Sequence, residues 1–281
     1  MNKQTMNTQS MKYDIRLIEL NEFDFDNLIF SDVVEKKISN DKTYKQSKVY
    51  YKHDEETYGP VIFPLSKKLS FGVQPNNVDK DGNLMVQDGV PMTTPTAYKA
   101  PLVMVNKEPR PEDQEEVDFL DGLKQHIQDW AVEHKKDLGR AKKSDDTVRD
   151  MVSEVVYRKE DDDEASPILY CELMYYKQNQ KMNTIFYGPG DKQVDPRKYN
   201  STCLIEPNIR FDCLNITPKA ISIKLRMYDA VVEPLRKGGP MKRLAKKNEA
   251  ELEDDENDDD TVHTDLAVDE VEEKSDDGFF D

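Results

Sequence analysis

Residues 220–233 read AISIKLRMYDAVVE, and their pattern indicates the fold class that the rest of the sequence supports. Its apolar positions 221, 223, 225 and 227 alternate with Ser222, Lys224, Arg226 and Tyr228. Side chains point to opposite faces along a β-strand, so strict alternation predicts a strand with one apolar face. We therefore expect one face to pack on a core and the other, which is basic and aromatic, to face solvent.

Further strand-like segments lie on both sides of a stretch with helical periodicity. Short apolar or alternating runs such as YDIRLIEL, SKVYYKH and APLVMVN precede residue 109, and runs such as PILYCELMYY and IRFDCLNI follow residue 166. Between them, Leu120, Leu123, Ile127 and Trp130 share one helical stripe, and a second, shorter helix is expected in DDTVRDMVSEVVYRK after Ser144. The order of elements is therefore several strands, a helical insertion over about 112–158 and several more strands. This order indicates a mainly β fold, namely a Greek-key barrel interrupted by a helical insertion.

Negative charge is concentrated at one end of the chain. The formal net charge is −17, but residues 248–281 contain 17 of the 57 acidic residues and a single lysine, so the other 247 residues carry a net charge of −1. Like charges with few apolar groups cannot form a core. We expect a disordered N-terminus (1–11), one folded domain (12–235), a basic linker (236–247) and a disordered acidic tail (248–281).

The cysteines and the absence of long apolar runs suggest a compartment. Cys171, Cys203 and Cys213 are odd in number and lie among apolar residues, which favours buried, reduced thiols over a disulfide framework. The first residues contain no apolar signal core, and no run reaches the roughly 18 apolar residues that a membrane span requires. We expect an intracellular protein that is neither secreted nor membrane-bound.

Motifs typical of enzymes are missing from the sequence. It contains no phosphate-binding glycine loop, and its four histidines are not spaced as metal ligands with one another or with the cysteines. We therefore expect no catalytic residues, no metal and no cofactor. A divergent nuclease, which would need carboxylates clustered around a divalent ion, stays open as an alternative.

Tyrosines and lysines are interleaved on several of the expected strands. Unpaired bases stack on aromatic rings, while lysine and arginine neutralise phosphates, so this mixture favours binding of single-stranded nucleic acid. In KTYKQSKVYYKH, the period of two places four such residues on one face. The candidate nucleic-acid-binding residues are Tyr44, Lys48, Tyr50, Lys52, Lys68, Phe71, Tyr176, Lys177, Lys198, Tyr199, Lys224, Arg226 and Tyr228.

The acidic tail ends in SDDGFFD, which places two aromatic residues in an otherwise aromatic-free segment. A peptide of this kind can occupy a basic, aromatic-lined groove in place of DNA, or bind basic pockets on partner proteins. The candidate partner-binding residues are Asp276, Asp277, Phe279 and Phe280.

The order of elements from about residue 12 to 233, together with this tail, resembles the OB-fold single-stranded-DNA-binding proteins of podophages and nucleocytoplasmic large DNA viruses. The final Asp281 and the length of the helical insertion depart from the family's pattern. The resemblance implies an OB-like barrel and a part in viral DNA replication, recombination and repair. It also implies contacts of the tail with DNA polymerase or helicase, in the host cytoplasm, a viral factory or the nucleus.

The sequence leads to one main hypothesis and one rival. In the first, single-stranded DNA stacks on the tyrosines of the barrel, and the tail competes for the same groove. In the second, the chain is an acidic chaperone or scaffold protein that binds basic proteins through its tail. The sequence does not decide between DNA and RNA, or between a monomer and a homodimer.

Overall fold

The computed structural model describes residues 11–235 apart from 40–41, 79–82, 88, 107, 161 and 163–164. These residues belong to one compact unit. Residues 1–10 of the expected N-terminal segment, the basic linker expected over 236–247 and the acidic tail expected over 248–281 lie outside the described residues.

A closed ring of five strands forms the centre of the unit. In ring order the strands are β7 (Lys68–Ser70), β11 (Tyr98–Val103), β12 (Ile168–Leu173), β18 (Ile221–Pro234) and β17 (Cys203–Ile216). Neighbours are antiparallel except β12 and β18, which are parallel. The first three strands follow chain order and the last two are reversed, which is a Greek-key arrangement. The expected mainly β, OB-like barrel with a helical insertion is confirmed.

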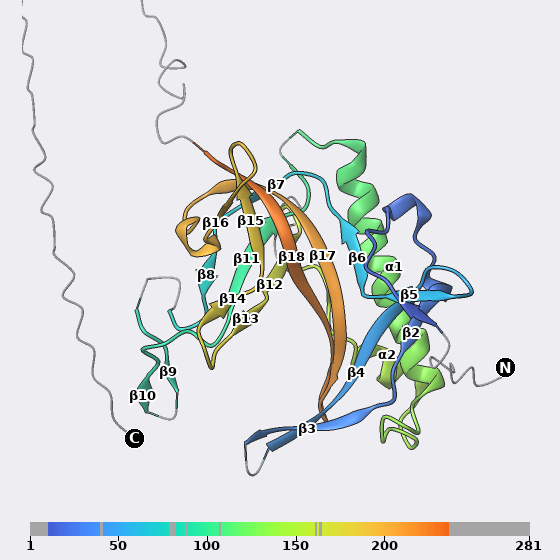
Figure 1. Ribbon diagram of the computed structural model, residues 1–281. Helices are drawn as coiled ribbons and strands as arrows, with labels where there is room; N and C mark the ends of the chain where they lie inside the picture. Colours follow the sequence, from blue (N-terminus) through green and yellow to red (C-terminus); the bar gives the residue numbers. More distant parts are fainter. Residues whose placement is uncertain are drawn as a thin grey trace, which may run out of the picture. The chain divides into compact units, whose positions relative to one another are not determined.

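The strands β17 and β18 are longer than the others of the ring and curve together through the middle of the molecule (Figure 1). Ile221, Leu225 and Met227 are buried, as their alternation predicts. The register of the two strands shifts between Asn208 and Ile209 and again between Phe211 and Cys213. Such bulges increase local twist and bend a strand, which suits a strand that leaves a closed barrel.

A sheet extension continues from the ribbon of β17 and β18. β4 (Lys42–Lys52) pairs with the C-terminal end of β17, and β6 (Val61–Pro64) pairs with its middle. The remaining strands of the extension, which all connect to β4 directly or through a neighbour, are β3 (Val34–Ser39), β2 (Leu28–Phe30), β5 (Thr57–Gly59) and β1 (Lys12–Tyr13).

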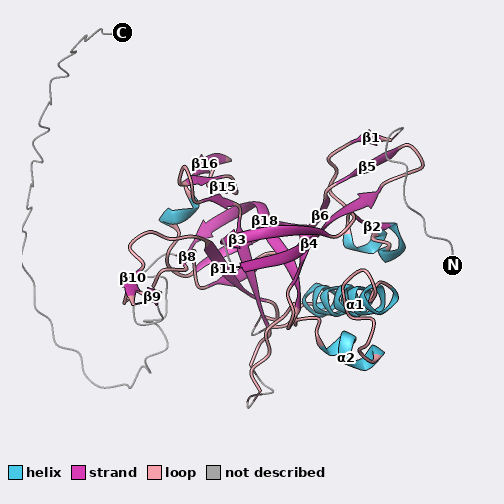
Figure 2. Cartoon of the chain, turned by 90° about the horizontal axis from the view of Figure 1, so that it is seen from below, coloured by secondary structure: helices cyan, strands magenta, loops and turns pink. Residues whose placement is uncertain are grey.

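The helix α1 (Pro111–Glu133) connects β11 to β12 and begins with a proline at its first position, where no backbone N–H is required. Its buried stripe includes the four residues expected from the sequence, Leu120, Leu123, Ile127 and Trp130. α1 covers the side of the extension formed by β2, β4 and β6, and α2 (Asp145–Asp150) lies beside it (Figures 1 and 2). The core therefore runs from the barrel into the layer between this sheet and α1.

The second helix is shorter than the sequence predicts, and the expectation of helix up to about residue 158 is wrong. Ser144 caps α2 as expected, accepting a hydrogen bond from the backbone N–H of Thr147 at 3.2 Å. Beyond Asp150 the chain becomes extended and forms bridges from Val152 to Ile221 and from Tyr157 to Ile168. The valines of this segment favour extended structure, and pairing with β12 and β18 supplies the hydrogen bonds that a helix would have made.

Smaller elements surround the barrel. Two 3₁₀ turns precede β2 (Leu20–Glu22 and Phe25–Asn27), and a third follows β16 (Pro196–Lys198). The short strands are β8 (Gln74–Pro75), β9 (Val86–Gln87), β10 (Val90–Pro91), β13 (Tyr175–Tyr176), β14 (Lys181–Met182), β15 (Ile185–Gly188) and β16 (Lys192–Val194). None of the helices in the part of the chain that the structure describes is long and apolar enough to cross a membrane.

All three cysteines are buried free thiols, as expected. Burial raises the pKa of Cys203 and Cys213 to about 11 and raises that of Cys171 further. A thiol that stays protonated is a poor nucleophile, so these side chains serve packing.

Candidate functional site

The outward face of the barrel carries an exposed pair of tyrosines on β12 and the segment before it. Tyr157 and Tyr170 are 51% and 44% exposed, and their rings meet edge to face with centroids 6.1 Å apart. The alternation of β12 determines this placement, because Leu169 and Cys171 on either side of Tyr170 point into the core. We call Tyr157 and Tyr170 the barrel tyrosine pair.

A row of basic side chains continues from this pair across the neighbouring strands. Lys99 on β11 lies opposite Glu172 on β12, and Arg226 on β18 lies between Glu172 and Arg210 on β17. Residues directly opposite in a sheet share a face, so all of these side chains point outward. We call the cations of this face the basic band: Lys48, Lys99, Arg210, Lys224 and Arg226.

Two carboxylates hold the central part of the basic band in place. Glu172 accepts a hydrogen bond from Lys224 at 2.7 Å and lies 3.9 Å from the Nε of Arg226. Asp212, which the second bulge of β17 places on this face, lies 3.1 Å from both Arg210 and Arg226. These two carboxylates contact three of the five cations of the band, Lys224, Arg210 and Arg226.

Two cations of the band make no ion pair with any residue in the described ranges. Lys48 on β4 is exposed and lies opposite Cys213. Lys99 has its Nζ 4.9 Å from the ring centroid of Tyr170, a cation–π contact. Their ammonium groups can therefore bind an anion such as phosphate.

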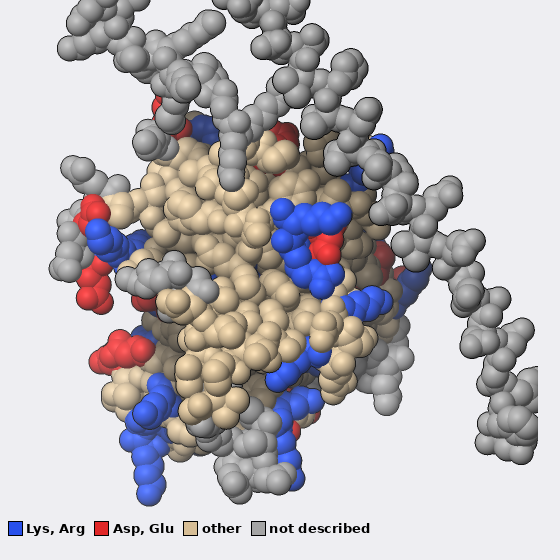
Figure 3. Space-filling model, turned by 90° about the vertical axis from the view of Figure 1, so that its left-hand side faces the viewer, with Lys and Arg blue, Asp and Glu red and all other residues tan. Residues whose placement is uncertain are grey.

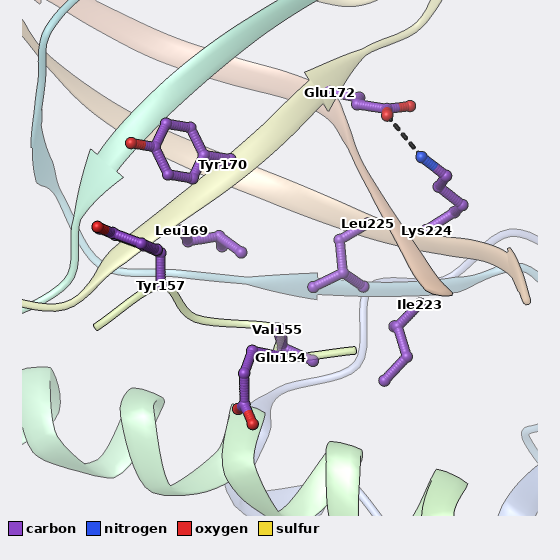
Figure 4. A pocket seen from close by; sticks show the side chains of 9 residues that line it. All are labelled: Glu154, Val155, Tyr157, Leu169, Tyr170, Glu172, Ile223, Lys224 and Leu225. Carbon is purple, nitrogen blue, oxygen red and sulfur yellow. Dashed lines mark hydrogen bonds and ion pairs between the residues drawn. The ribbon is translucent and has the colours of Figure 1, made fainter. Parts of the chain in front are cut away.

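A shallow pocket of about 240 Å³ opens where β12 and β18 diverge beside the barrel tyrosine pair. Figure 4 shows Leu169, Ile223 and Leu225 at its centre, the two tyrosines on one side and the Glu172–Lys224 ion pair on the other. An apolar floor with an aromatic wall and a charged rim suits a flat, partly polar ring.

The space-filling view of the face on the left of Figure 1 shows where the charges of the unit gather (Figure 3). Blue side chains form patches in its right half, with little red between them, and much of the remaining surface is uncharged. The positive charge is thus local, because residues 1–235 contain 40 acidic and 33 basic residues in total.

The structure brings together part of the site expected from the sequence. Lys48, Lys224 and Arg226 belong to the basic band, and Tyr50 and Lys52 continue the same face of β4. Tyr44 is half-buried at the far end of β4, opposite Lys36 on β3, and Tyr228 is half-buried beside the first bulge of the ribbon.

Other expected residues lie on separate elements. Tyr176 and Lys177 belong to the small hairpin of β13 and β14, which forms a sheet of its own. Phe71 is 46% exposed just after β7. Lys198 is in the third 3₁₀ turn, and Tyr199 beside it packs against Phe186 with ring centroids 6.0 Å apart.

Lys68 is not on any surface, and its expected contact with nucleic acid is wrong for this fold. It is completely buried, and its Nζ donates hydrogen bonds to Asp113 at 2.6 Å and to the carbonyl of Met104 at 2.9 Å. Its Nζ also lies 2.6 Å from Glu116. Both carboxylates are on the first turns of α1, so this lysine fastens the helix to β7 and cannot reach a phosphate.

Burial by itself would raise the pKa of Asp113. Hydrogen bonds from Lys68 and Arg110, and from the backbone N–H groups of Arg110 and Asn106, outweigh that effect and hold the pKa well below its usual range. The carboxylate is therefore ionised in the folded protein.

Sequence reasoning missed Lys99, Tyr157, Tyr170 and Arg210. The signal for Tyr170 was present, since it alternates with Leu169, Cys171 and Leu173 in PILYCELMYY. No comparable pattern marks Tyr157, because the sequence around it predicts a helix. No group of histidine, cysteine, aspartate or glutamate side chains among the described residues is arranged to hold a metal ion.

Comparison with solved structures finds the single-stranded DNA-binding protein from bacteriophage Enc34, at 12% sequence identity. Its complex with single-stranded DNA gives a TM-score of 0.34 and covers 73% of this chain and 97% of that chain. Its C-terminal truncation gives a TM-score of 0.33 and covers 73% and 96%, respectively.

No curated protein matches the sequence. A family model does, and it covers residues 21–272, which include the barrel, the helical insertion and much of the acidic tail. The chain therefore belongs to the family described as "Protein of unknown function (DUF2738)".

Proposed function

We propose that the folded unit binds single-stranded DNA along the outward face of its barrel. The observation that carries the proposal is the exposed barrel tyrosine pair beside a band of five cations, two of which, Lys48 and Lys99, make no ion pair with any described residue. Bases stack on Tyr157 and Tyr170, and the basic band neutralises the phosphates that connect them. The face of the second and third strands of an OB-like barrel, here β11 and β12, is the part that such folds use for oligonucleotides.

The acidic tail supplies the second part of the proposal. Its 17 acidic residues and its terminal Phe279 and Phe280 match the chemistry of the barrel face, which accepts both negative charge and aromatic rings. The tail competes with DNA for this face and, when DNA displaces it, is free to recruit a DNA polymerase or helicase. A role in viral DNA replication, recombination and repair follows from this arrangement and from the resemblance described above.

Binding of fluorescently labelled oligonucleotides, measured by anisotropy across salt concentrations, tests both parts. A Tyr170→Ala variant loses about 1–3 kcal/mol of binding free energy, while Tyr170→Phe keeps the ring and stays close to wild type. Deleting residues 248–281 tightens binding, most strongly at low salt. An RNA oligonucleotide of the same sequence, added as competitor, measures the preference between the two nucleic acids.

An acidic chaperone that binds basic proteins through residues 248–281 is the competing function, and the charge of the tail is what favours it. The oligonucleotide-binding measurements described above distinguish DNA binding from a chaperone function. A tail-deleted protein that binds no oligonucleotide even in dilute buffer contradicts the DNA-binding proposal, whereas an affinity that the deletion leaves unchanged contradicts only the competition step.

A further inference from the structure

A second group of aromatic side chains lies outside the barrel, on the sheet extension. Tyr58 on β5 is flanked by Tyr13 on β1 and Tyr50 on β4, with ring centroids 5.6 and 5.7 Å away. The ring planes are inclined by 79° and 75°, so both contacts are edge to face. In this geometry a ring covers at most one face of its neighbour, and Tyr13 is still 49% exposed. We call Tyr13, Tyr50 and Tyr58 the extension tyrosines.

The extension tyrosines share a face with the basic band. Tyr50 and Lys48 are two positions apart on β4, so their side chains point the same way. Lys48 lies opposite Cys213 on β17, which in turn lies opposite Lys224 on β18. The same outward surface therefore runs from the extension tyrosines through Lys48 and Lys224 to the barrel tyrosine pair.

Three carboxylates near the extension tyrosines, Asp14, Asp54 and Glu55, are paired with cations. Asp14 follows Tyr13 in extended chain, so its side chain points to the opposite face, where it lies 2.7 Å from Arg16. Arg16 also lies 3.6 Å from Asp54. Lys52 is paired with Glu55 at 2.8 Å, while Lys48 makes no ion pair within the described part of the chain. An approaching phosphate meets Lys48 without having to displace a carboxylate.

We propose that the extension tyrosines form a second stacking site for the same DNA strand, with Lys48 holding a phosphate between the two sites. This inference rests on the proposed function, and it determines how long a strand the protein engages. Tyr50 on β4 and Tyr170 on β12 are three strand spacings apart, roughly 14 Å at about 4.8 Å each, and Tyr13 on β1 is two spacings further, roughly 24 Å from β12. At about 3.4 Å of rise per stacked nucleotide, roughly four to seven nucleotides connect the two sites.

The two sites make affinity depend on the length of the strand. An oligonucleotide of about 4 nucleotides reaches one site, whereas one of about 12 reaches both, within the range known for OB folds. Once a strand is held at the barrel, its second contact is intramolecular and benefits from a high effective concentration. Removing the second site therefore weakens the long oligonucleotide and leaves the short one unaffected.

The test uses the full chain and oligothymidylates of these two lengths. Tyr13→Ala and Lys48→Ala each weaken binding of the long oligonucleotide about tenfold, in line with the cost of losing one stacked base or one phosphate contact. Tyr13→Phe, the matched control, keeps wild-type affinity for both lengths. Both positions are solvent-exposed, and thermal unfolding of each variant verifies that the fold is intact.

The outcomes separate this inference from the proposed function. If the wild type binds the long oligonucleotide and Tyr13→Ala binds it equally well, the second site is refuted while DNA binding by the barrel stands. If the wild type binds neither oligonucleotide, both ideas fail together. A Tyr13→Ala variant that loses affinity equally for both lengths also contradicts a second site, because the short strand should be unaffected.

Discussion

Replacing Lys68 by methionine tests whether this lysine fastens α1 to the barrel or serves DNA. The substitution keeps the length of the side chain but removes the ammonium group that lies 2.6 Å from both Asp113 and Glu116. The side chains of these carboxylates are only 1% and 4% exposed, so one cation is lost from a buried cluster. Removing one partner of a buried ion pair costs about 3–5 kcal/mol, because the remaining charge stays desolvated.

For a unit of this size, 1 kcal/mol corresponds to about 2–4 °C in the midpoint of thermal unfolding. We therefore expect Lys68→Met to lower Tm by about 6–20 °C in a thermal scan at pH 7. The double variant Lys68→Met, Glu116→Gln should recover part of this loss. It removes one uncompensated charge and keeps an amide oxygen that can accept the hydrogen bond from the backbone N–H of Ser66.

The pH dependence provides an independent check. The hydrogen bonds from Lys68 and Arg110 depress the pKa of Asp113 in spite of its burial, so its stabilisation is present above its unfolded pKa, about 3.9, and is lost as pH falls. Without Lys68, the pKa of Asp113 is lowered by a smaller amount. The difference in stability between wild type and Lys68→Met should therefore narrow below about pH 4.

DNA binding at a temperature where Lys68→Met is folded should equal that of the wild type. A variant with unchanged Tm but weaker DNA binding and a lower salt dependence would refute the buried role of this lysine.

Three further outcomes are expected. Arg226→Ala should reduce the slope of log affinity against log salt concentration by about 0.7, the contribution of one phosphate contact on a single strand, whereas the exposed Lys192→Ala on β16 should leave it unchanged. Because burial raises the pKa of Cys203 and Cys213 to about 11, alkylation at pH 8 should be at least about 100-fold slower in the folded protein than in denaturant. Burial against Phe25 and Phe30 lowers the pKa of His126, although Asp26 and Asp129 raise it. Stability should therefore fall as pH drops below about 6.5, and His126→Phe should reduce that dependence in thermal scans at several pH values.

Features that depend on local periodicity and composition could be predicted from the sequence. The alternation of residues 221–227 predicted the buried positions Ile221, Leu225 and Met227, while Ile223 is only partly buried, and the stripe of Leu120, Leu123, Ile127 and Trp130 predicted the buried face of α1. Burial of the three cysteines followed from their apolar neighbours. These features are readable because one face of a strand or helix must pack on a core, whatever the rest of the chain does.

Long-range packing, which no local pattern reveals, determines which face of a short strand is buried and which distant side chains come into contact. Lys67 and Lys68 are adjacent in sequence, yet Lys67 reaches Glu233 at the surface while Lys68 is buried against carboxylates 45 and 48 positions away. A three-residue strand has too few positions to show its alternation. Burial of Lys68 is tolerated only because α1 brings Asp113 and Glu116 to it.

The conformation of residues 151–157 and the composition of the candidate site also depend on long-range contacts. The valines of residues 151–157 fit a helical stripe as well as a strand. The segment is extended because it forms bridges with the ends of β12 and β18. Likewise, Lys48, Lys224 and Tyr170 are far apart in the chain, and they share a face because β4, β17, β18 and β12 pair side by side in the sheet. The alternating pattern predicted that aromatic and basic residues lie on strands. Long-range strand pairing determines which of these residues lie next to one another.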